Sequence, residues 1–434
     1  MEPARALYKG GIDFKALALQ SPEFAKHLSS SQQLDFNDPE AVRQLTITLL
    51  RLDFGLEVKL PEDRLCPPVP NRLNYILWVQ DLLDSTTGKI STRYDPERKV
   101  LGLDIGTGCC SIYPLLGCKA RPHWAFLATD IDENNIRTSK ENVALNQLQS
   151  RIRIIQTDPQ DSLFPLDKLQ TSRLDFTMCN PPFYKSRDEM IESAEIKANA
   201  PSSICTGDPV EMITPGGEVA FVTRMIDESL QLRDRIQWYT SMLGSLSSLN
   251  PLIETLQKHG NHNYAVKEFV QGNKTKRWAI AWSWTDMRPA MTAARGIPKF
   301  APKQLPFPAD LTFTLPMAIS IDAASAGLNA ELSELPWYWL WDQRLSAGVG
   351  YTSENVWSRQ ARRKAKLAGE DGSASRLPTV PEKVALGVRI KLTLARGNKH
   401  TEQQVQVLIS WVQGADSVLF ESFCGMVKRK LGER

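Results

Sequence analysis

Four consecutive residues near the middle of the chain, Asn180, Pro181, Pro182 and Phe183, have the groups needed to hold an amine beside a planar ring. An asparagine amide can accept one hydrogen of an exocyclic amine while the Pro181 carbonyl accepts the other. The prolines stiffen the turn, and Phe183 could stack on the base that carries the amine. The alternative is an ordinary turn, because asparagine and proline both favour turns.

A pair of glycines lies earlier in the chain, at the end of the apolar run LGLDI. Gly106 and Gly108 let the backbone turn sharply and let a nucleoside approach it, because neither residue has a Cβ. A dinucleotide-binding loop would have a further glycine where this chain has Ser111, so the loop is a poor cradle for a pyrophosphate. Without other signals, a tight turn explains the glycine pair equally well.

An acidic residue, Asp130, ends the apolar run AFLATD about 20 residues after the glycine pair, the spacing at which a carboxylate meets ribose hydroxyls. It could instead cap the helix expected from Glu133, although Asp132 is better placed for that role. Asp130, the glycine pair and Asn180 together describe S-adenosylmethionine held at a sheet edge, with an amine in line with its methyl group. Because the sulfonium is itself a strong electrophile, we expect no metal and no covalent enzyme intermediate.

The elements that must position these residues follow from the hydrophobic pattern between residue 100 and about residue 284. Short apolar runs alternate with polar helical stretches, which indicates a parallel sheet flanked by helices. We expect strands at 100–105, 124–129, 152–156, 174–179 and 219–222, and helices at 133–148, 224–235 and 252–258. Two later strand-like runs, 264–270 and 277–284, are separated only by QGNKTK, so they predict an antiparallel hairpin.

The predicted fold class is α/β: a Rossmann-like class I methyltransferase with a mostly parallel seven-stranded sheet and a terminal antiparallel hairpin, plus a small α+β C-terminal domain. The predicted parts are an N-terminal arm and helical extension at 1–99, the core at 100–288, a proline-containing linker at 289–309 and the C-terminal domain at 310–434. The extension would contain helices at 39–50 and 73–83. The C-terminal domain would contain strands at 311–315, 384–394 and 405–412, and a helix at 417–431.

The composition is that of a folded protein, since 42% of the 434 residues are hydrophobic and 23% are charged. The formal net charge is only +3, so the overall balance by itself predicts no polyanion partner, although a basic face could be hidden in the average. Seven cysteines without a repeated metal-type spacing indicate reduced thiols. Because the sequence has no long apolar run and no apolar N-terminal signal, we expect a location in the nucleus or the cytoplasm and no membrane partner.

Several strings carry a resemblance to a known family. They are DFNDPEAVRQLTITLLRLDFGL, VPNRLNYILWVQDLL, DIGTGCCSIYPLLG, MCNPPFY, SLQLRDRIQWYTSMLG and KRWAIAWSW. They resemble the methyltransferase-like RNA adenine-N6 methyltransferases that modify U6 small nuclear RNA, and more distantly the bacterial ribosomal RNA large-subunit adenine-N6 methyltransferases. The resemblance covers about residues 1–290. It implies the methyltransferase fold and an activity that uses S-adenosylmethionine as the cofactor.

The resemblance also implies which residues contact the cofactor. Arg72 matches an arginine that contacts it, with a surface ion pair as the alternative, and Gly106 matches the glycine-loop contact. Asp130 stands where the vertebrate members of the family have glutamate, so the acidic function is kept with a shorter side chain. Ser162 aligns with a threonine that touches the cofactor, and Asp158 is the alternative contact after the third strand.

The catalytic residues are implied in the same way. Asn180 matches the catalytic asparagine, Pro181 the residue with the second acceptor and Phe183 the stacking ring, with Pro182 between them. One departure is Asp161, because some members have a lysine there, in a loop proposed to occlude the cofactor site. Autoinhibition of that kind would be absent or built differently in this chain.

RNA contact is implied for basic residues outside the core. The N-terminal arm carries Arg5, Lys9, Lys15 and Lys26, and the polar loop 185–208 follows the catalytic motif. A further basic run lies in an insertion at 359–377 and consists of Arg359, Arg362, Arg363, Lys364 and Lys366. This run could bind phosphate or direct nuclear import, and the alternative for all these residues is a solvated surface.

The sequence therefore predicts an S-adenosylmethionine-dependent methyltransferase of the N6 amine of an adenosine in structured RNA, with U6 small nuclear RNA as the expected substrate. One alternative is transfer to another nitrogen, such as guanine N2 or a protein glutamine. The other is a non-catalytic RNA-binding splicing factor with the same fold. The C-terminal domain could correspond to the RNA-binding accessory domain of family members, and its aromatic run at 337–341 could stack bases or pack in a core.

Overall fold

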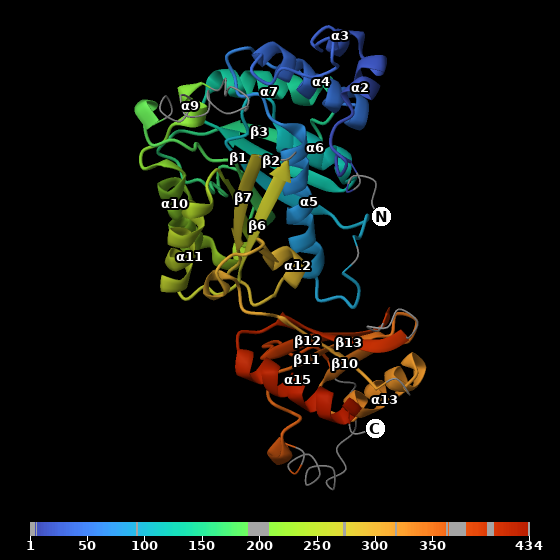
Figure 1. Ribbon diagram of the computed structural model, residues 1–434. Helices are drawn as coiled ribbons and strands as arrows, with labels where there is room; N and C mark the ends of the chain where they lie inside the picture. Colours follow the sequence, from blue (N-terminus) through green and yellow to red (C-terminus); the bar gives the residue numbers. More distant parts are fainter. Residues whose placement is uncertain are drawn as a thin grey trace. The chain divides into compact units, whose positions relative to one another are not determined.

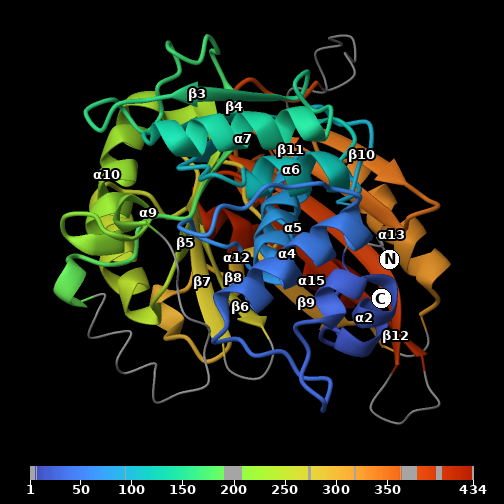
Figure 2. The same ribbon diagram turned by 90° about the horizontal axis from the view of Figure 1, so that it is seen from above.

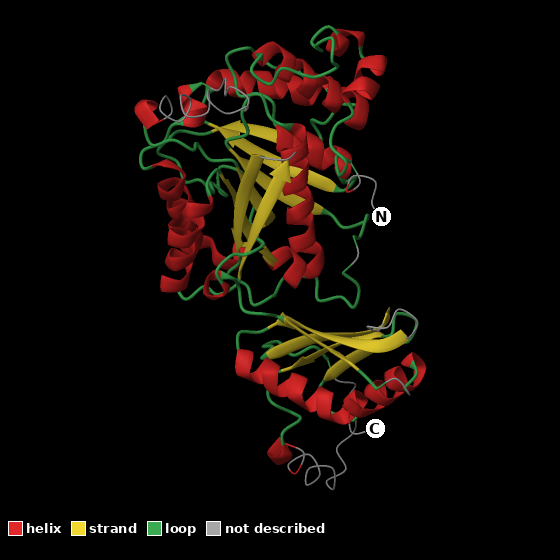
Figure 3. Ribbon diagram, in the orientation of Figure 1, coloured by secondary structure: helices red, strands yellow, loops and turns green. Residues whose placement is uncertain are grey.

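The structure is a computed structural model that describes residues 5, 7–92, 94–189, 208–271, 275–316, 319–361, 363, 379–396 and 403–432. The chain forms two compact units. Unit 1 consists of residues 1–80, 95–285 and 295–306, and unit 2 consists of residues 81–94, 286–294 and 307–434. Each unit has its own sheet and its own hydrophobic core (Figure 1 and Figure 3).

Unit 1 is built on an eight-stranded sheet in the order β3-β2-β1-β4-β5-β7-β6-β8. Its strands are β1 (Val100–Ile105), β2 (Trp124–Asp130), β3 (Ile152–Gln156), β4 (Leu174–Cys179), β5 (Ile236–Leu243), β6 (Tyr264–Gln271), β7 (Thr275–Trp282) and β8 (Arg295–Gly296). Strands β1 to β5 are paired in parallel, whereas β7 is antiparallel to β5 and β6. The predicted fold class and the predicted hairpin are confirmed, and β8 adds a two-residue strand beside β6.

The parallel strands carry apolar side chains on both faces, as strands covered by helices on both sides do. In β1, every residue except Leu101 is buried, and β4 has the same pattern. Gly102 of β1 is paired with Phe176 of β4, and a Cβ at Gly102 would lie 2.3 Å from the Phe176 ring. Glycine at this position therefore lets the ring lie across the neighbouring strand.

Helices cover both faces of this sheet. Helices α6 (Ile112–Ala120) and α7 (Glu133–Leu145) follow β1 and β2, and α10 (Gly217–Leu232) precedes β5. Because β2 and β5 lie on opposite sides of β1, right-handed connections place α10 on the opposite face from α6 and α7. Figure 1 shows α10 and α11 (Leu249–Lys258) on one side of the sheet and α5 (Val69–Ser85) and α6 on the other. Figure 2 shows the same separation of α10 from α5 and α6 from above.

The predicted strand at 219–222 is wrong, because these residues belong to α10. The buried residues of this helix include Val222, Met225, Ile226 and Ser229, which recur at helical spacing. A short apolar run does not distinguish a buried strand from a segment of a buried helix. The other strands and helices predicted for unit 1 are confirmed, although α10 begins at Gly217 and not at residue 224, where the predicted helix began.

The N-terminal extension consists of α2 (Phe14–Gln20), α3 (Pro22–Ala25), α4 (Pro39–Phe54) and the first part of α5. Helix α4 begins where the Asp38 side chain accepts a hydrogen bond from the Glu40 N–H, and it ends at Gly55, whose φ is 59°. A polar cap and a terminal glycine are the usual start and end of a helix. An extended segment, residues 56–68, then leads to α5 and is called the strap below.

Asn142 of α7 and Asn146, the C-cap of the same helix, bind the strap to the core. The Asn142 side chain accepts a hydrogen bond from the Lys59 N–H at 2.7 Å and donates one to the Lys59 carbonyl at 3.1 Å. The Asn146 side chain makes the same pair of hydrogen bonds with Glu57, at 3.0 and 2.7 Å. Asn142 also donates to the Cys109 carbonyl at 3.0 Å, so α7 joins the strap to the segment after β1.

Unit 2 contains a five-stranded antiparallel sheet in the order β10-β11-β12-β13-β9. Its strands are β9 (Asp310–Thr314), β10 (Tyr338–Asp342), β11 (Ala347–Thr352), β12 (Leu386–Arg396) and β13 (Gln403–Gln413), and its longer helices are α13 (Ile321–Ser333) and α15 (Ser417–Gly432). Both helices pack on one face of the sheet (Figure 1). The three strands and the helix predicted here are confirmed, whereas β10, β11 and α13 were not predicted.

The aromatic run 337–341 packs within unit 2. Trp337 and Trp339 stack with ring centroids 5.3 Å apart, and Trp339 and Trp341 stack at 6.0 Å. A Cβ at Gly348 or Gly350 of β11 would lie within 2.5 Å of a tryptophan ring. Core packing, one of the two roles considered for this run, accounts for these contacts.

The two units differ from the predicted parts at residues 81–94 and 286–294, which belong to unit 2, and at residues 295–306 of the predicted linker, which belong to unit 1. The Arg389 guanidinium of β12 donates to the Lys89 carbonyl at 2.7 and 3.0 Å, which holds the first of these segments. A backbone carbonyl as partner leaves no mark in the local sequence, so the pattern of residue types could not place this boundary.

Candidate functional site

The carboxyl ends of β1, β2 and β4 meet at one edge of the sheet of unit 1. The chain order reverses between β1 and β4, and ligands of open α/β sheets bind at such a switch point. A cavity of about 530 Å³ opens here, within the range of ~300–1,000 Å³ usual for small-molecule sites. Seven predicted site residues line it: Arg72, Gly106, Asp130, Ser162, Asn180, Pro181 and Pro182.

The glycine loop after β1 has the sharp turn that the sequence predicts. Gly106 and Gly108 have φ values of 68° and 64°, in the left-handed region that favours glycine. Ser111, at the position where a dinucleotide loop would have a glycine, also has a left-handed backbone, with φ 51°. The loop thus keeps the predicted conformation at two glycines and at one residue with a side chain.

Asp130 fixes this loop from the end of β2. Its carboxylate accepts hydrogen bonds from the Gly108 N–H at 2.8 Å and the Asp132 N–H at 3.0 Å. Burial raises the pKa of Asp130, while these two N–H groups lower it. The cap of α7 is Asp132, which accepts from the Asn135 N–H at 2.8 Å, so Asp130 is not the helix cap.

Asp104 supports the loop from beneath, a role the sequence analysis did not assign. Its side chain is 1% exposed and accepts a hydrogen bond from the Thr107 hydroxyl at 2.7 Å. Its other oxygen, Oδ1, has no hydrogen-bond partner among the described residues. Burial raises the pKa of Asp104 to about 7, with a smaller contribution from the charge of Asp130.

Arg72 reaches the cavity from α5 and is 6% exposed, so the surface ion pair considered for it does not apply. Its Nη1 donates to the Tyr113 hydroxyl at 2.7 Å and to the Met242 sulfur at 3.2 Å. In the described part of the chain, Nε has no hydrogen-bond partner. A buried guanidinium with an unused N–H fits an anionic group of a ligand, because a guanidinium can bind a carboxylate with two N–H groups.

Asn180 follows the last residue of β4 and contributes to the cavity wall. Its Oδ1 is buried and, within the described ranges, has no hydrogen-bond partner. A buried acceptor without a donor is costly, so such atoms usually have a partner when the site is filled. Pro181, whose carbonyl is the second predicted acceptor, is buried beside it. These residues can hold an amine in the cavity.

The Phe183 ring rests on the loop after β5. A Cβ at Gly244 would lie 2.9 Å from the ring, so the ring depends on glycine there. The buried carboxylate of Glu218 fixes Gly244 by accepting from its N–H at 2.6 Å, and it also accepts from the Ser248 hydroxyl at 2.5 Å. The Arg277 guanidinium lies 5.8 Å from the ring centroid.

The loop after β3 is held on α10. The Ser162 hydroxyl donates to Glu228 at 2.7 Å, and Arg224 forms an ion pair with the same carboxylate at 2.7 Å. Arg224 also donates to the Asp161 carbonyl at 2.6 Å, while the Asp161 carboxylate pairs with Lys168 at 2.8 Å. Ser162 therefore lines the cavity while its hydroxyl binds Glu228.

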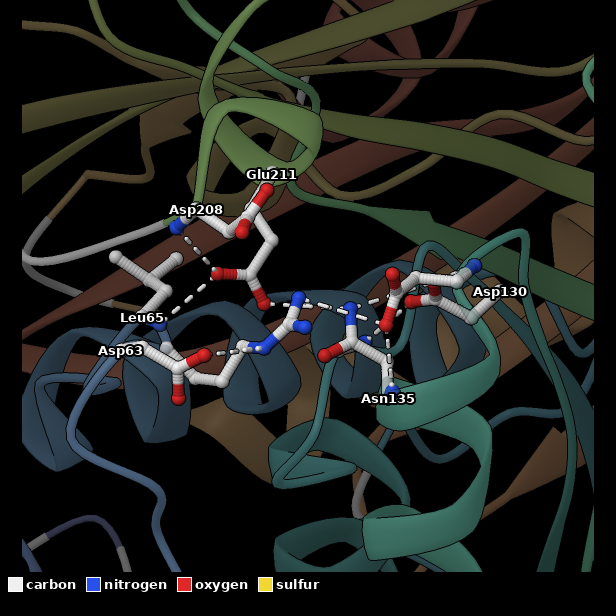
Figure 4. Close-up of polar contacts among 9 residues, drawn as sticks. Asp63, Leu65, Asp130, Asn135, Asp208 and Glu211 are labelled. Atoms are coloured by element: carbon white, nitrogen blue, oxygen red, sulfur yellow. Dashed lines mark hydrogen bonds and ion pairs between the residues drawn. The ribbon is translucent and has the colours of Figure 1, made fainter.

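The structure adds Glu211 to the cavity wall, which sequence reasoning did not single out. It lies in α9 (Pro209–Met212), directly after the polar loop 185–208, and that position is the only signal the sequence offers. Figure 4 shows its carboxylate between Leu65 of the strap and Asn135 of α7, with Asp130 beyond Asn135.

The residues expected to contact RNA are only partly described. Lys9, Lys15 and Lys26 are exposed in the N-terminal extension. Residues 190–207 of the predicted RNA loop, and residues 362 and 364–377 of the basic insertion, lie outside the described residues.

The described residues contain no group of three or more histidine, cysteine, aspartate or glutamate side chains that could hold a metal ion. The six cysteines placed there are free thiols. Among the described helices, none combines the length and apolar character needed to cross a bilayer.

A mostly parallel sheet that ends in an antiparallel hairpin, with a glycine loop, an acidic residue and an Asn-Pro-Pro-Phe motif at successive strand ends, defines an S-adenosylmethionine-dependent methyltransferase. Residues 2–286 match the family model described as RNA methyltransferase. The chain belongs to this family, and the family resemblance noted in the sequence is confirmed.

Relatives that cover almost the whole chain support this assignment. The U6 small nuclear RNA (adenine-(43)-N(6))-methyltransferase of Schizosaccharomyces pombe is 35% identical over 404 residues, which cover 92% of this chain and 95% of the relative. The RNA N(6)-adenosine-methyltransferase mettl16 of Danio rerio is 36% identical over 461 residues, covering 96% and 94%.

Solved structures match about two thirds of the chain. The hMettl16 catalytic domain in complex with MAT2A 3′UTR hairpin 1 is 41% identical, with a TM-score of 0.57, and the match covers 66% of this chain and 97% of that one. The N-terminal domain of human METTL16 in complex with SAH is 40% identical, with a TM-score of 0.54, covering 65% and 98%. The cavity size, the unused Arg72 Nε and the unpartnered Asn180 Oδ1 fit S-adenosylmethionine, which is the cofactor of this enzyme.

Proposed function

We propose that this enzyme methylates the N6 amine of an adenosine in structured RNA. The observation that carries the proposal is the buried Asn180 Oδ1, which has no partner among the described residues and stands in the cavity wall next to Pro181. The names of the Schizosaccharomyces pombe and Danio rerio relatives, which specify adenine and adenosine N6 methylation, support it.

The chain's own residues supply binding and orientation. The Asn180 amide oxygen and the Pro181 carbonyl accept the two amine hydrogens, which turns the nitrogen lone pair out of conjugation with the ring. S-adenosylmethionine supplies the methyl group on an electrophilic sulfonium. Phe183 stacks on the extruded base, a contact typically worth ~1–3 kcal/mol. The surplus proton leaves to solvent after transfer, so no residue is assigned as a general base.

The cofactor would be held by three parts of the cavity wall. The Asp130 carboxylate keeps acceptor capacity for ribose hydroxyls, because each of its oxygens can accept more than one hydrogen bond. The glycine loop leaves space for the nucleoside, and Arg72 binds the methionine carboxylate. Ser162 is assigned to the same cavity through the loop that Glu228 holds.

The expected substrate is U6 small nuclear RNA. This expectation rests on the relative that is named for this RNA and that aligns over 95% of its own length. A U6 substrate places the activity in the nucleus, and localisation of the tagged full chain by microscopy checks that placement. Exclusion of the tagged chain from the nucleus would contradict it.

The test is a tritium-methyl transfer assay on a U6 hairpin, on total RNA and on total protein, with wild type and Asn180→Ala. We expect N6-methyladenosine as the labelled nucleoside and a loss of at least about 100-fold in Asn180→Ala, because a positioned acceptor at a reacting centre typically contributes that much. Asn134→Ala, an exposed position of α7, is the matched control and should retain wild-type activity.

The assay also separates the alternatives. Label in protein but not in RNA would favour a glutamine substrate, and labelled guanosine would favour guanine N2. RNA binding without label in any fraction would favour a non-catalytic RNA-binding protein. Each of these outcomes would overturn the N6-adenosine proposal.

A further inference from the structure

Glu211 connects three segments that are far apart in the sequence. Its Oε2 accepts a hydrogen bond from the Leu65 N–H of the strap at 2.9 Å and from the Asp208 N–H at 3.2 Å. Its Oε1 accepts from the Asn135 side-chain amide of α7 at 3.3 Å. The strap, the end of the polar loop 185–208 and α7 therefore meet at one carboxylate (Figure 4).

The contacts continue from Glu211 to the glycine loop. The Asn135 amide that donates to Glu211 also lies 3.4 Å from Asp130 Oδ1, and Asp130 Oδ2 accepts from the Gly108 N–H. Leu65, Asn135, Asp130 and Gly108 all line the cavity. A displacement of Glu211 would therefore reach the part of the wall assigned to the cofactor's ribose.

Glu211 is a carboxylic acid at a position where burial disfavours its charged form. Burial raises the pKa of Glu211, and the nearby charge of Asp130 raises it further, while the N–H groups of Leu65 and Asp208 and the charge of Arg64 lower it. Leu65, Asp208 and Asn135 all donate hydrogen bonds to Glu211, so both of its side-chain oxygens must act as acceptors. A neutral amide of the same shape could not meet this requirement.

We propose that Glu211 is a positioning residue, which acts through Asn135 and Leu65 to hold the ribose end of the cofactor site and joins that site to the segment that follows the RNA loop. The inference concerns the site that would bind S-adenosylmethionine, the cofactor that the family's activity requires. It depends on the proposed function only where it assigns the loop 185–208 to RNA.

The variant Glu211→Gln tests the inference, because it places an amide NH₂ among N–H donors at unchanged size. In the full-length protein we expect the dissociation constant of S-adenosylhomocysteine, measured by calorimetry, to rise about tenfold, since a lost or opposed charged hydrogen bond typically has an effect of this order. The KM for S-adenosylmethionine should rise in parallel, whereas kcat at saturating cofactor should stay within about threefold, because Asn180 and Pro181 are untouched.

Glu62→Gln is the matched control. This carboxylate also belongs to the strap, its side chain is 85% exposed, and it pairs with Arg43 at 3.2 Å. Its removal should change the affinity for S-adenosylhomocysteine by less than about twofold, since exposed ion pairs contribute little. An affinity of Glu211→Gln within twofold of wild type, whatever its melting temperature, would overturn the inference.

A double-mutant cycle with Asn135→Leu tests the route and does not require each variant to be fully stable. If Glu211 acts through Asn135, the double variant should lose little more affinity than the more affected single variant. Additive losses would overturn the proposed route. Failure of the wild-type protein to bind S-adenosylhomocysteine would instead count against its being an S-adenosylmethionine enzyme at all, and this binding needs no RNA substrate.

Discussion

Four buried polar atoms in or beneath the cavity wall are without partners among the described residues: Asn180 Oδ1, Asn135 Oδ1, Arg72 Nε and Asp104 Oδ1. A protein that buries such atoms loses free energy unless a ligand or a water molecule pairs with them. The amide oxygens, the guanidinium N–H and the carboxyl oxygen differ in chemistry. Together they match a ligand that has polar groups at several points. At the residue scale, the unused hydrogen-bonding groups of the cavity therefore indicate that it binds a ligand.

The first prediction concerns Gly244, against which the Phe183 ring packs. Gly244→Ala adds a methyl group 2.9 Å from the ring, and the position does not have a left-handed backbone that would itself require glycine. We expect the KM for RNA to rise about tenfold, as overpacking of a well-packed site costs on the order of 1–3 kcal/mol. Steady-state kinetics with varied RNA measure this change, and calorimetry should give an unchanged affinity for S-adenosylhomocysteine.

The control for this experiment is Gly10→Ala, because a Cβ at Gly10 would meet no atom within 4 Å. Its kinetic constants should equal those of wild type. A Gly244→Ala enzyme with an unchanged KM for RNA and a weakened cofactor affinity would contradict the assignment of this glycine to the Phe183 ring.

The buried carboxyl of Asp104 gives a prediction about pH. Burial raises its pKa from 3.8 to about 7, so the folded protein binds the proton more tightly than the unfolded chain does. The free energy of unfolding should therefore fall as the pH rises from about 4 to about 7, and the loss should be complete above that range. In the variant Asp104→Asn, the amide oxygen can still accept the hydrogen bond from the Thr107 hydroxyl, and the side chain no longer titrates.

Urea unfolding of the cofactor-free protein at a series of pH values measures this effect. At about pH 8 we expect Asp104→Asn to be more stable than wild type, by at most about 4 kcal/mol, which is the free energy equivalent of the shift. Parallel pH profiles for the two proteins would show that Asp104 does not titrate in this range.

At the scale of elements, α7 is both a crossover helix of the sheet and the anchor of the strap. The side chains of Asn142 and Asn146 bind backbone groups of the strap much as a neighbouring strand would. The strap in turn contributes Leu65 and Pro67 to the cavity wall. The extension thus contributes to the cavity wall, and its contact with α7 holds it there.

The two asparagines should differ in their effect on stability. Asn142 is buried and Asn146 is half-buried, so water can replace the lost hydrogen bonds only at Asn146. We expect Asn142→Ala to lower the free energy of unfolding by about 2–3 kcal/mol and Asn146→Ala by about 1 kcal/mol. Urea unfolding compares them, with Asn134→Ala as the exposed control. An equal or larger effect at Asn146 would contradict this account of the strap.

The elements that sequence patterns predicted are those with long or repeated local signals. The parallel strands and the β6–β7 hairpin follow from apolar runs and a short connection, and Asp130 and Asn180 follow from their places at strand ends. The error at 219–222 arose because four apolar-rich residues suit a strand or a helix equally well. The roles of Glu211 and Glu218 could not be predicted, because they arise from partners distant in the sequence, such as Leu65, 146 residues from Glu211.

At the scale of the whole molecule, a formal net charge of +3 did not indicate an RNA partner, although the chain belongs to an RNA methyltransferase family. Charge balance is an average over all surfaces, whereas phosphate contacts require cations at one place. Lys9, Lys15 and Lys26 are exposed in the N-terminal extension, so this part of the chain carries several basic side chains at its surface. A near-neutral protein can in this way carry a local surface for a polyanion.

The asparagine clamp on the strap also bears on how the protein is made. Asn142 and Asn146 are translated 83 and 89 residues after the backbone groups that they bind. At ~5–20 residues per second, the ribosome needs about 4–18 s to add that length of chain. During this time the backbone groups of Glu57 and Lys59 cannot pair with the two asparagines, so this part of the extension reaches its final position only after α7 has been synthesised.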